Sequence, residues 1–432
     1  MTNRSPITEQ TAARAPYRRA ASGPGGGESP GTAPVAVFDN TWSVTTCSMA
    51  SLGRRGVPLH VYGQGFGRWS RYCTRRLPCP PVDDADRFLV WLEGRIRAGE
   101  IGRVAPTTDL IAYYTSLLRD VFPPEVRRTI APIDEIENCL IKTRFAEKCR
   151  RIGQPVPATV VTDSVAEALA AGDSLGYPLI MKPQAHLGTG AAERGLLVED
   201  REMLRRVFQP YSLVAGHAAI VSRHPELRWP LLQRYIPSAR TRVYSVSGFK
   251  DADGGIIVAS LSCKRHQWPP NVGVSTWQVT CHDPRILAAG LAVVNGLISC
   301  GIFEVELLED GHELLAIDLN PRAFGFLPLD MAIGNDLPWL WYQATHQALR
   351  PRTGAAPAWG AAARGGAPYW LARLVGAIDE EAEPSPRRTV SMLGYWNDPL
   401  PMVLNQLSLL RNPRSLFRPY IRRAASRSRV GT

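Results

Sequence analysis

The residues best suited to chemistry lie within residues 301–322. Two segments in this range alternate apolar and polar residues with a period of two, which predicts two half-buried strands. An Asp-Gly pair between them is typical of a hairpin turn. Pairing the strands would bring Glu306, Asp318 and Asn320 to one face, with Arg322 beside them, because 318 and 320 are two residues apart.

Two carboxylates and an amide oxygen on one face form an oxygen-rich site that suits Mg²⁺. Magnesium keeps several waters and takes further ligands from substrate phosphates, so few protein ligands suffice. The alternative interpretation is a surface hairpin whose polar face meets water. The segment Asn-Pro-Arg at 320–322, followed by Ala-Phe-Gly at 323–325, favours the metal site.

The elements that must position this hairpin begin near the N-terminus. From residue 34 to about residue 130, short apolar runs alternate with helical stretches, and this pattern predicts a small α/β domain. Arg71 and Asp109 follow predicted strands of this domain, and we expect them to contact a substrate.

A second unit is expected to carry three of the five lysines in the sequence, of which Lys142 and Lys182 are candidate site residues. One helix is predicted over 134–153 with Lys142 near its middle, and another over 164–175 with an N-terminal capping box. A buried strand is then predicted over 176–183, with Lys182 near its end. Burying a lysine is costly unless an anion meets it, although its ammonium could instead extend to water. The small-residue loop that follows offers backbone amides to cover phosphates.

Three further strands are predicted over 229–237, 241–248 and 255–264. The last ends in Lys264 and Arg265, and we expect it to lie beside the Glu306 hairpin in the same sheet. A basic pair at a strand end is often a solvated face, so a phosphate-binding role and a solvated face both stay open.

Together these motifs resemble the ATP-grasp superfamily. The resemblance implies an α/β (α+β) ATP-grasp fold, with an N-terminal α/β domain over 34–130 and two ATP-clamping subdomains over 131–232 and 233–350. It implies that Lys142 and Lys182 bind ATP phosphates, that Gly188, Thr189 and Gly190 lie in a lid, and that a hinge binds adenine. The hinge residues would be Gln233, Arg234, Tyr235 and Ile236, where the family often has a glutamate.

The resemblance also assigns the metal and the reaction. Glu306, Asp318 and Asn320 would hold Mg²⁺ or Mn²⁺ with ATP, and Arg322 would face a phosphate; Asp318 replaces the more usual glutamate. The basic segment at 264–273 resembles carboxylate–amine ligases related to D-aspartate ligase, where Lys264 and Arg265 would meet the γ-phosphate and acyl phosphate. We therefore expect an ATP-dependent ligase that forms an amide or peptide bond between a small carboxylic acid and an amine such as an amino acid. The alternatives are a non-catalytic ATP-binding module and an ATP-grasp carboxylase.

Composition adds expectations about the remaining segments. Residues 1–33 are expected to be a disordered leader, and 351–432 a C-terminal extension. Eight scattered cysteines predict reduced thiols in a cytoplasmic protein. The formal net charge is +11, and residues 411–432 hold seven arginines and no acid. That tail predicts at best a weak electrostatic contact with an anionic surface, and no specific nucleic-acid partner.

Overall fold

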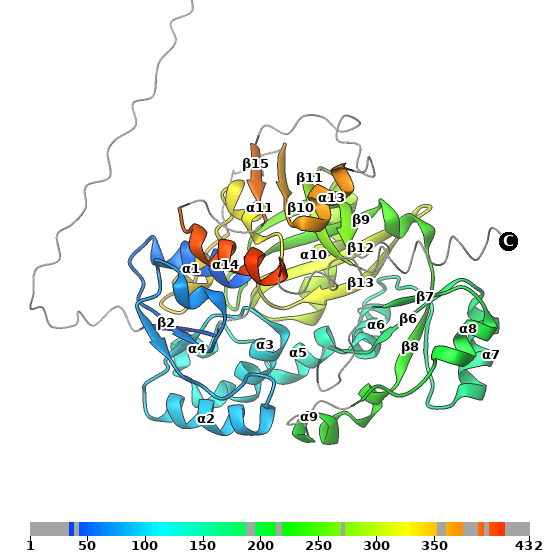
Figure 1. Ribbon diagram of the computed structural model, residues 1–432, viewed down its shortest axis with the longest axis horizontal. Helices are drawn as coiled ribbons and strands as arrows, with labels where there is room; N and C mark the ends of the chain where they lie inside the picture. The colour runs from blue at the N-terminus through cyan, green and yellow to red at the C-terminus, as the bar shows by residue number, and fades with distance from the viewer. Residues whose placement is uncertain are drawn as a thin grey trace, which may run out of the picture. The chain divides into compact units, whose positions relative to one another are not determined.

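Three β-sheets organise the chain (Figure 1). The structure is a computed structural model that describes residues 34–38, 43–185, 187, 195–212, 218–268, 273–351, 360–374, 388–392 and 397–410. The mixture of helices and strands confirms the expected α/β class. Among the described residues, no helix has the length and apolar character needed to cross a membrane. All eight cysteines lie in the described ranges, and none forms a disulfide.

The first sheet is parallel, in the order β3-β2-β1-β4. Its strands are β1 (Val35–Phe38), β2 (Leu59–Tyr62), β3 (Arg75–Leu77) and β4 (Arg103–Val104). Every residue of β1 is buried, as expected for a parallel strand that is covered on both faces. The accompanying helices are α1 (Ser43–Gly53), α2 (Ala85–Arg97), α3 (Asp109–Leu117) and α4 (Pro124–Arg127).

The second sheet is antiparallel, in the order β5-β8-β6-β7. Its strands are β5 (Thr159–Val161), β6 (Leu179–Pro183), β7 (Leu196–Val198) and β8 (Pro230–Arg234). Helix α7 (Val165–Leu175) begins after Ser164, whose hydroxyl accepts from the Glu167 N–H, as the capping pattern predicted. Helices α8 (Arg201–Val207) and α9 (Ala218–Arg223) follow.

The third sheet runs β13-β12-β9-β10-β11-β14-β15 and contains the polar hairpin. Its strands are β9 (Val243–Asp251), β10 (Gly255–Trp268), β11 (Val274–Thr280), β12 (Gly301–Asp310), β13 (Glu313–Asn320), β14 (Ala361–Arg364) and β15 (Arg388–Ser391). Helices α10 (Pro284–Leu297), α11 (Leu327–Ala332), α12 (Leu337–Ala344), α13 (Ala367–Leu374) and α14 (Pro399–Leu410) complete the described part.

Two expectations about these elements were wrong. The basic strand β10 does not lie beside the hairpin, because β9 pairs with both β10 and β12 and separates them. The single helix expected over 134–153 is two helices, α5 (Ile133–Leu140) and α6 (Lys142–Arg151). Ile141 between them has extended backbone angles, so Lys142 opens a helix rather than lying in the middle of one.

The back of the hairpin packs against helices. Phe303, Val305 and Leu307 of β12 are buried in one cluster with residues of α6 and α10. Because successive strand residues point to opposite faces, burial of these odd-numbered residues turns Glu304 and Glu306 to the front. The hydrophobic core therefore determines which face carries the acids.

Gly290 of α10 lies close against β9 of the sheet, and it provides a test of this packing. A Cβ at position 290 would lie 2.5 Å from a methyl carbon of Val246. Gly290→Ala should therefore lower the free energy of unfolding by about 1–3 kcal/mol in urea titrations. Gly94→Ala in α2 is the matched control, since its Cβ would meet no atom within 4 Å. It should instead stabilise by about 0.5–1 kcal/mol; equal effects of the two changes would contradict the packing argument.

Candidate active site

A cavity of about 560 Å³ lies in front of the hairpin. It is lined by residues from β6, β8, β10, the hairpin and the first residue of α6. Twelve of the residues predicted from the sequence line it: Asp109, Lys142, Lys182, Gln233, Arg234, Tyr235, Ile236, Lys264, Glu306, Asp318, Asn320 and Arg322. Segments far apart in the sequence thus converge on one chamber.

The two predicted acids of the hairpin face each other across the strand pair. Glu306 is directly opposite Asp318 in the register of β12 and β13. Each carboxylate holds a lysine: Lys264 Nζ is 2.7 Å from Glu306 Oε1, and Lys142 Nζ is 3.0 Å from Asp318 Oδ1. These lysines come from different elements, so the two ion pairs tie β10 and α6 to the hairpin.

Lys264 reaches Glu306 across the intervening strand β9. Ser245 of β9 pairs with Glu306 on one side and with Ser262 of β10 on the other. Lys264 itself pairs with Val243, two residues from Ser245, so its long side chain reaches diagonally across β9 to Glu306. This explains how Lys264 contacts the hairpin although its strand is not adjacent.

Lys182 differs from the other two lysines. Among the described residues its ammonium forms no hydrogen bond or ion pair, and burial together with the nearby Lys142 lowers its pKa to about 7. A poorly solvated cation beside a second cation favours an incoming anion. The position of Lys182 therefore suits a phosphate group.

Glu304 also faces the cavity, and our sequence reasoning missed it. It lies opposite Asn320, whose side-chain amide donates to Glu304 Oε2 at 2.7 Å. The Ser245 hydroxyl donates to its other oxygen at 2.8 Å. Burial, followed by the charge of Glu306, raises the pKa of Glu304 to about 7. The signal was present in the sequence, since Glu304 is two residues from Glu306 and must share its face.

Arg322 connects the hairpin to the N-terminal sheet. Its Nε lies 2.6 Å from Asp109 Oδ1 at the start of α3, and its Nη2 donates to the Asn320 amide oxygen at 2.9 Å. Asp109 lines the cavity, as expected. Arg71 does not; its backbone N–H donates to Asp398 and its guanidinium to the Asn397 carbonyl.

The segment from β8 into the next turn forms the wall where a hinge was expected. The Gln233 amide donates to Thr159 Oγ1 at 2.9 Å, and Arg234 pairs with Asp310 at 3.0 Å. The Tyr235 hydroxyl is buried and has no hydrogen-bond partner among the described residues. The Arg234 guanidinium is thus paired with Asp310 at the end of β12, whereas the Tyr235 hydroxyl is available to a ligand.

Besides Arg71, four predicted site residues are not seen in the cavity wall. Arg265 is described, but it is absent from the lining and lies near Cys281. Gly188, Thr189 and Gly190 of the expected lid lie outside the described residues. Their assignments stay predictions.

The cavity also bears on metal binding. Within the described ranges, no cluster of three or more His, Cys, Asp or Glu side chains is spaced to hold a metal alone. Two facing carboxylates and the Asn320 amide oxygen nevertheless fit a Mg²⁺ ion that takes its remaining ligands from phosphates and water. The donor set therefore suits a metal that arrives with a nucleotide.

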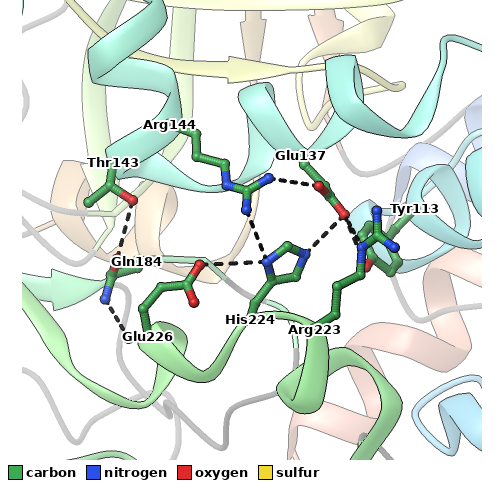
Figure 2. Close-up of polar contacts among 8 residues, drawn as sticks. All are labelled: Tyr113, Glu137, Thr143, Arg144, Gln184, Arg223, His224 and Glu226. Atoms are coloured by element: carbon green, nitrogen blue, oxygen red, sulfur yellow. Dashed lines mark hydrogen bonds and ion pairs between the residues drawn. The ribbon is translucent and has the colours of Figure 1, made fainter.

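A buried polar cluster around Glu137 lies at the junction of α5 and α6 and holds the start of α6 (Figure 2). Glu137 accepts from His224 at 2.9 Å, from Arg223 at 2.7 Å and from Arg144 at 2.8 Å. These contacts join α5, α6 and α9 beside Lys142, and they lower the pKa of Glu137 although burial opposes this.

Gln184 extends the cluster to β6. Its carbonyl accepts from the Lys142 N–H at 2.8 Å, and its side-chain amide donates to the carbonyls of Glu226 and Trp229. The backbone carbonyl of Gln184, a residue whose side chain is buried, therefore sets the position of Lys142 relative to the strand that bears Lys182.

Comparisons with known proteins bear on the fold of this chain. No family model matches the chain. A carbamoyl phosphate synthase large chain from Hyperthermus butylicus is 39% identical over 204 residues, which is 44% of this chain but only 17% of that protein. The chain thus spans less than a fifth of that relative's length.

Solved structures match more of the chain at lower identity. An L-amino acid ligase from Bacillus licheniformis has a TM-score of 0.55 and 16% identity, covering 73% of this chain and 75% of its own. The biotin carboxylase domain of 2-oxoglutarate carboxylase from Hydrogenobacter thermophilus, solved with MgADP and bicarbonate, has a TM-score of 0.56 and 15% identity, covering 73% and 70%.

These likenesses, together with the three sheets, define the fold: the chain has the ATP-grasp fold. This confirms the fold that the resemblance of its motifs implies.

The Glu137 cluster predicts a stability effect. Glu137→Gln would leave buried His224 and the half-exposed Arg144 and Arg223 without their carboxylate, and should cost about 2 kcal/mol in urea unfolding at pH 7. Because the folded pKa lies below its ordinary value of 4.5, this contribution is complete above pH 4.5. The difference from wild type should shrink as the pH falls below that value.

The control for this prediction is Glu147→Gln in α6, which removes an exposed ion pair with Arg151 and should change stability by less than about 0.5 kcal/mol. A loss at Glu137 no larger than at Glu147 would contradict the role of the cluster.

Proposed function

We propose that the chain is an ATP-dependent carboxylate–amine ligase, which forms an amide bond through an acyl phosphate and releases ADP and phosphate. The observation that carries the proposal is the convergence of Lys142, Lys182 and Lys264 with Glu306 and Asp318 in one cavity. Phosphoryl transfer depends mainly on positioning and on neutralising charge, which these groups supply without a nucleophilic side chain.

ATP would lie along the hairpin. The adenine would contact the wall made by Gln233–Ile236, beside the apolar side chains of Ile236 and Leu308. Lys182 and Lys142 would bind phosphates, and the low pKa of Lys182 means that the incoming phosphate would stabilise its protonated form.

Glu306, Asp318 and Asn320 would hold Mg²⁺, for which Mn²⁺ is a chemical substitute. Bound there, the ion would neutralise phosphate charge. Both carboxylates are paired with lysines in this structure, so Lys264 and Lys142 would turn from the acids to phosphate oxygens as ATP enters.

The reaction needs two displacements. A carboxylate oxygen of the substrate attacks the γ-phosphorus, the bond from that phosphorus to the β-phosphate oxygen breaks, and ADP leaves. The amine nitrogen then attacks the acyl carbon and loses a proton to water, the carbon–oxygen bond breaks, and phosphate leaves. Lys264 and Arg322 would stabilise the negative oxygens, because both lie on the front of the sheet at the cavity wall.

The first test of this proposal is nucleotide binding. Lys142→Ala and Lys182→Ala should each weaken ATP binding at least about 10-fold in calorimetry, because each removes a charge-assisted contact. Lys148→Ala in the same helix α6 is the control, because Lys148 does not line the cavity. Unchanged affinity in both cavity variants would contradict the placement of ATP.

The pH dependence supplies a sharper readout for Lys182. Its pKa of about 7 means that free protein loses this charge as the pH rises above 7. The advantage of wild type over Lys182→Ala in ATP affinity should therefore be largest near pH 6 and should decrease toward pH 9. An advantage that grows with pH would contradict the assignment.

A second test concerns the metal. Glu306→Gln and Asp318→Asn should each reduce Mg²⁺-dependent ADP release with a carboxylic acid and an amine by about 100-fold or more, since a metal ligand is lost. Glu309→Gln, on the same strand but outside the cavity lining, should retain activity. ADP release that persists in wild type without any divalent metal would show that the hairpin is not a metal site.

A further inference from the structure

The cavity continues beyond the region assigned to ATP, and the residues of the hairpin give the order and spacing of the groups along its wall. On the front of β12, Leu308, Glu306 and Glu304 follow one another at about 6.7 Å per pair of residues. Asp318 and Asn320 lie opposite the two acids, and Arg322 follows them. The wall therefore runs from an apolar end, through the acids, to Arg322.

Past Arg322 the chain turns toward the N-terminal sheet. The Ala323 N–H donates to the Pro106 carbonyl at 3.0 Å, which places Thr107 and Thr108 beside the end of the hairpin. The next residues into the cavity are Phe324 and Phe326, with ring centroids 4.6 Å apart.

The end of the cavity beyond Arg322, here called the far end, is apolar and distinct from the end beside Ile236. Val44, Phe324, Phe326 and Met392 all line the cavity and belong to one buried cluster. Ile236 and Leu308 belong to a different, smaller cluster. The cavity thus has two apolar ends with the charged groups between them, and a single nucleotide base accounts for only one.

Charge at the far end is already balanced. The charged residues nearest to it along the chain, Asp109 and Arg322, form an ion pair at 2.6 Å. Its other polar lining comes from uncharged side chains such as Ser43, Thr108 and Asn405. A charged substrate side chain placed there would lose water without gaining a partner.

One polar group at this end is available. Thr107 lines the cavity and is 3% exposed, and its hydroxyl has no hydrogen-bond partner among the described residues. A hydroxyl can donate to a carboxylate or accept from an ammonium. It therefore suits the polar end of an amino acid whose side chain enters the apolar end.

We infer that the far end of the cavity receives an apolar amino-acid side chain, such as that of leucine, methionine or phenylalanine, and that Met392 and the open position at Gly325 determine its size. The inference rests on the proposed ligase function. It assigns part of the C-terminal extension to substrate selection, because Met392 follows β15 and Asn405 lies in α14.

Gly325 offers a variant that should fold. A Cβ at this position meets no atom within 4 Å, and the residue lines the cavity. Gly325→Val would therefore add atoms to open space rather than to packed core. Met392→Ala would enlarge the same end, whereas Met331→Ala is the matched control, since Met331 packs against the same cluster without lining the cavity.

The experiment measures kcat/KM for ADP release in the full-length protein with Mg²⁺, ATP and a panel of amino acids. Wild type should prefer leucine, methionine or phenylalanine over aspartate, glutamate and lysine. Gly325→Val should lower kcat/KM for phenylalanine relative to alanine by about 10-fold or more, and Met392→Ala should shift preference toward the larger side chains. Met331→Ala should leave the order of preference unchanged.

Two outcomes separate this inference from the proposed function. ADP release that depends on acidic or basic amino acids, or a preference that both cavity variants leave unchanged, would overturn the inference and leave the ligase intact. No ADP release above the ATP-only background with any acid and amine would overturn the proposed function itself.

Discussion

Glu306 lies directly opposite Asp318, and Glu304 opposite Asn320, and the rest of the site depends on this register of β12 and β13. A slip of one residue would turn the acids into the core and expose Val305 and Leu307. Burial of the back of the hairpin against α6 and α10 therefore holds the front in place. The hydrophobic effect is not directional, but successive side chains of a strand point to opposite faces. Burial of one face therefore fixes the orientation of the other.

Placing several acids on one buried face creates a second constraint, because a buried charge is tolerated only with a partner. Lys264 meets Glu306, Lys142 meets Asp318, and Arg322 meets Asp109. Each pair joins a different part of the chain to the hairpin. The ion pairs of the hairpin thus hold in place the elements that bound the cavity.

The site is also asymmetric along its length. The charged centre lies between two apolar ends that belong to separate core clusters. One end is formed around the segment after β8, and the other uses residues from α1 and the segment after β4, from the chain after β13 and from the C-terminal region. The ligase that we propose would need such a division, because each ligand must be recognised apart from the reacting atoms.

Much of the site was readable from the sequence because its signals are local. A period of two over residues 301–320 was enough to predict the hairpin and its polar face, and a lysine at the end of an apolar run was enough to single out Lys182. Glu304 followed from the same period and was overlooked. The broken helix was missed because Ile141 is neither glycine nor proline, so its extended backbone carries no local signal.

Tertiary structure alone decided which distant residues meet. No spacing in the sequence shows that β9 separates β10 from the hairpin, that Lys264 reaches Glu306 across β9, or that Glu137 joins His224 beside Lys142. Nor does it show that Met392 shares a wall with Val44 and Phe326. Periodicity and turn chemistry depend on a few neighbouring residues and can be recognised in the sequence. Contacts between remote segments arise only when the sheets assemble and bury their common faces.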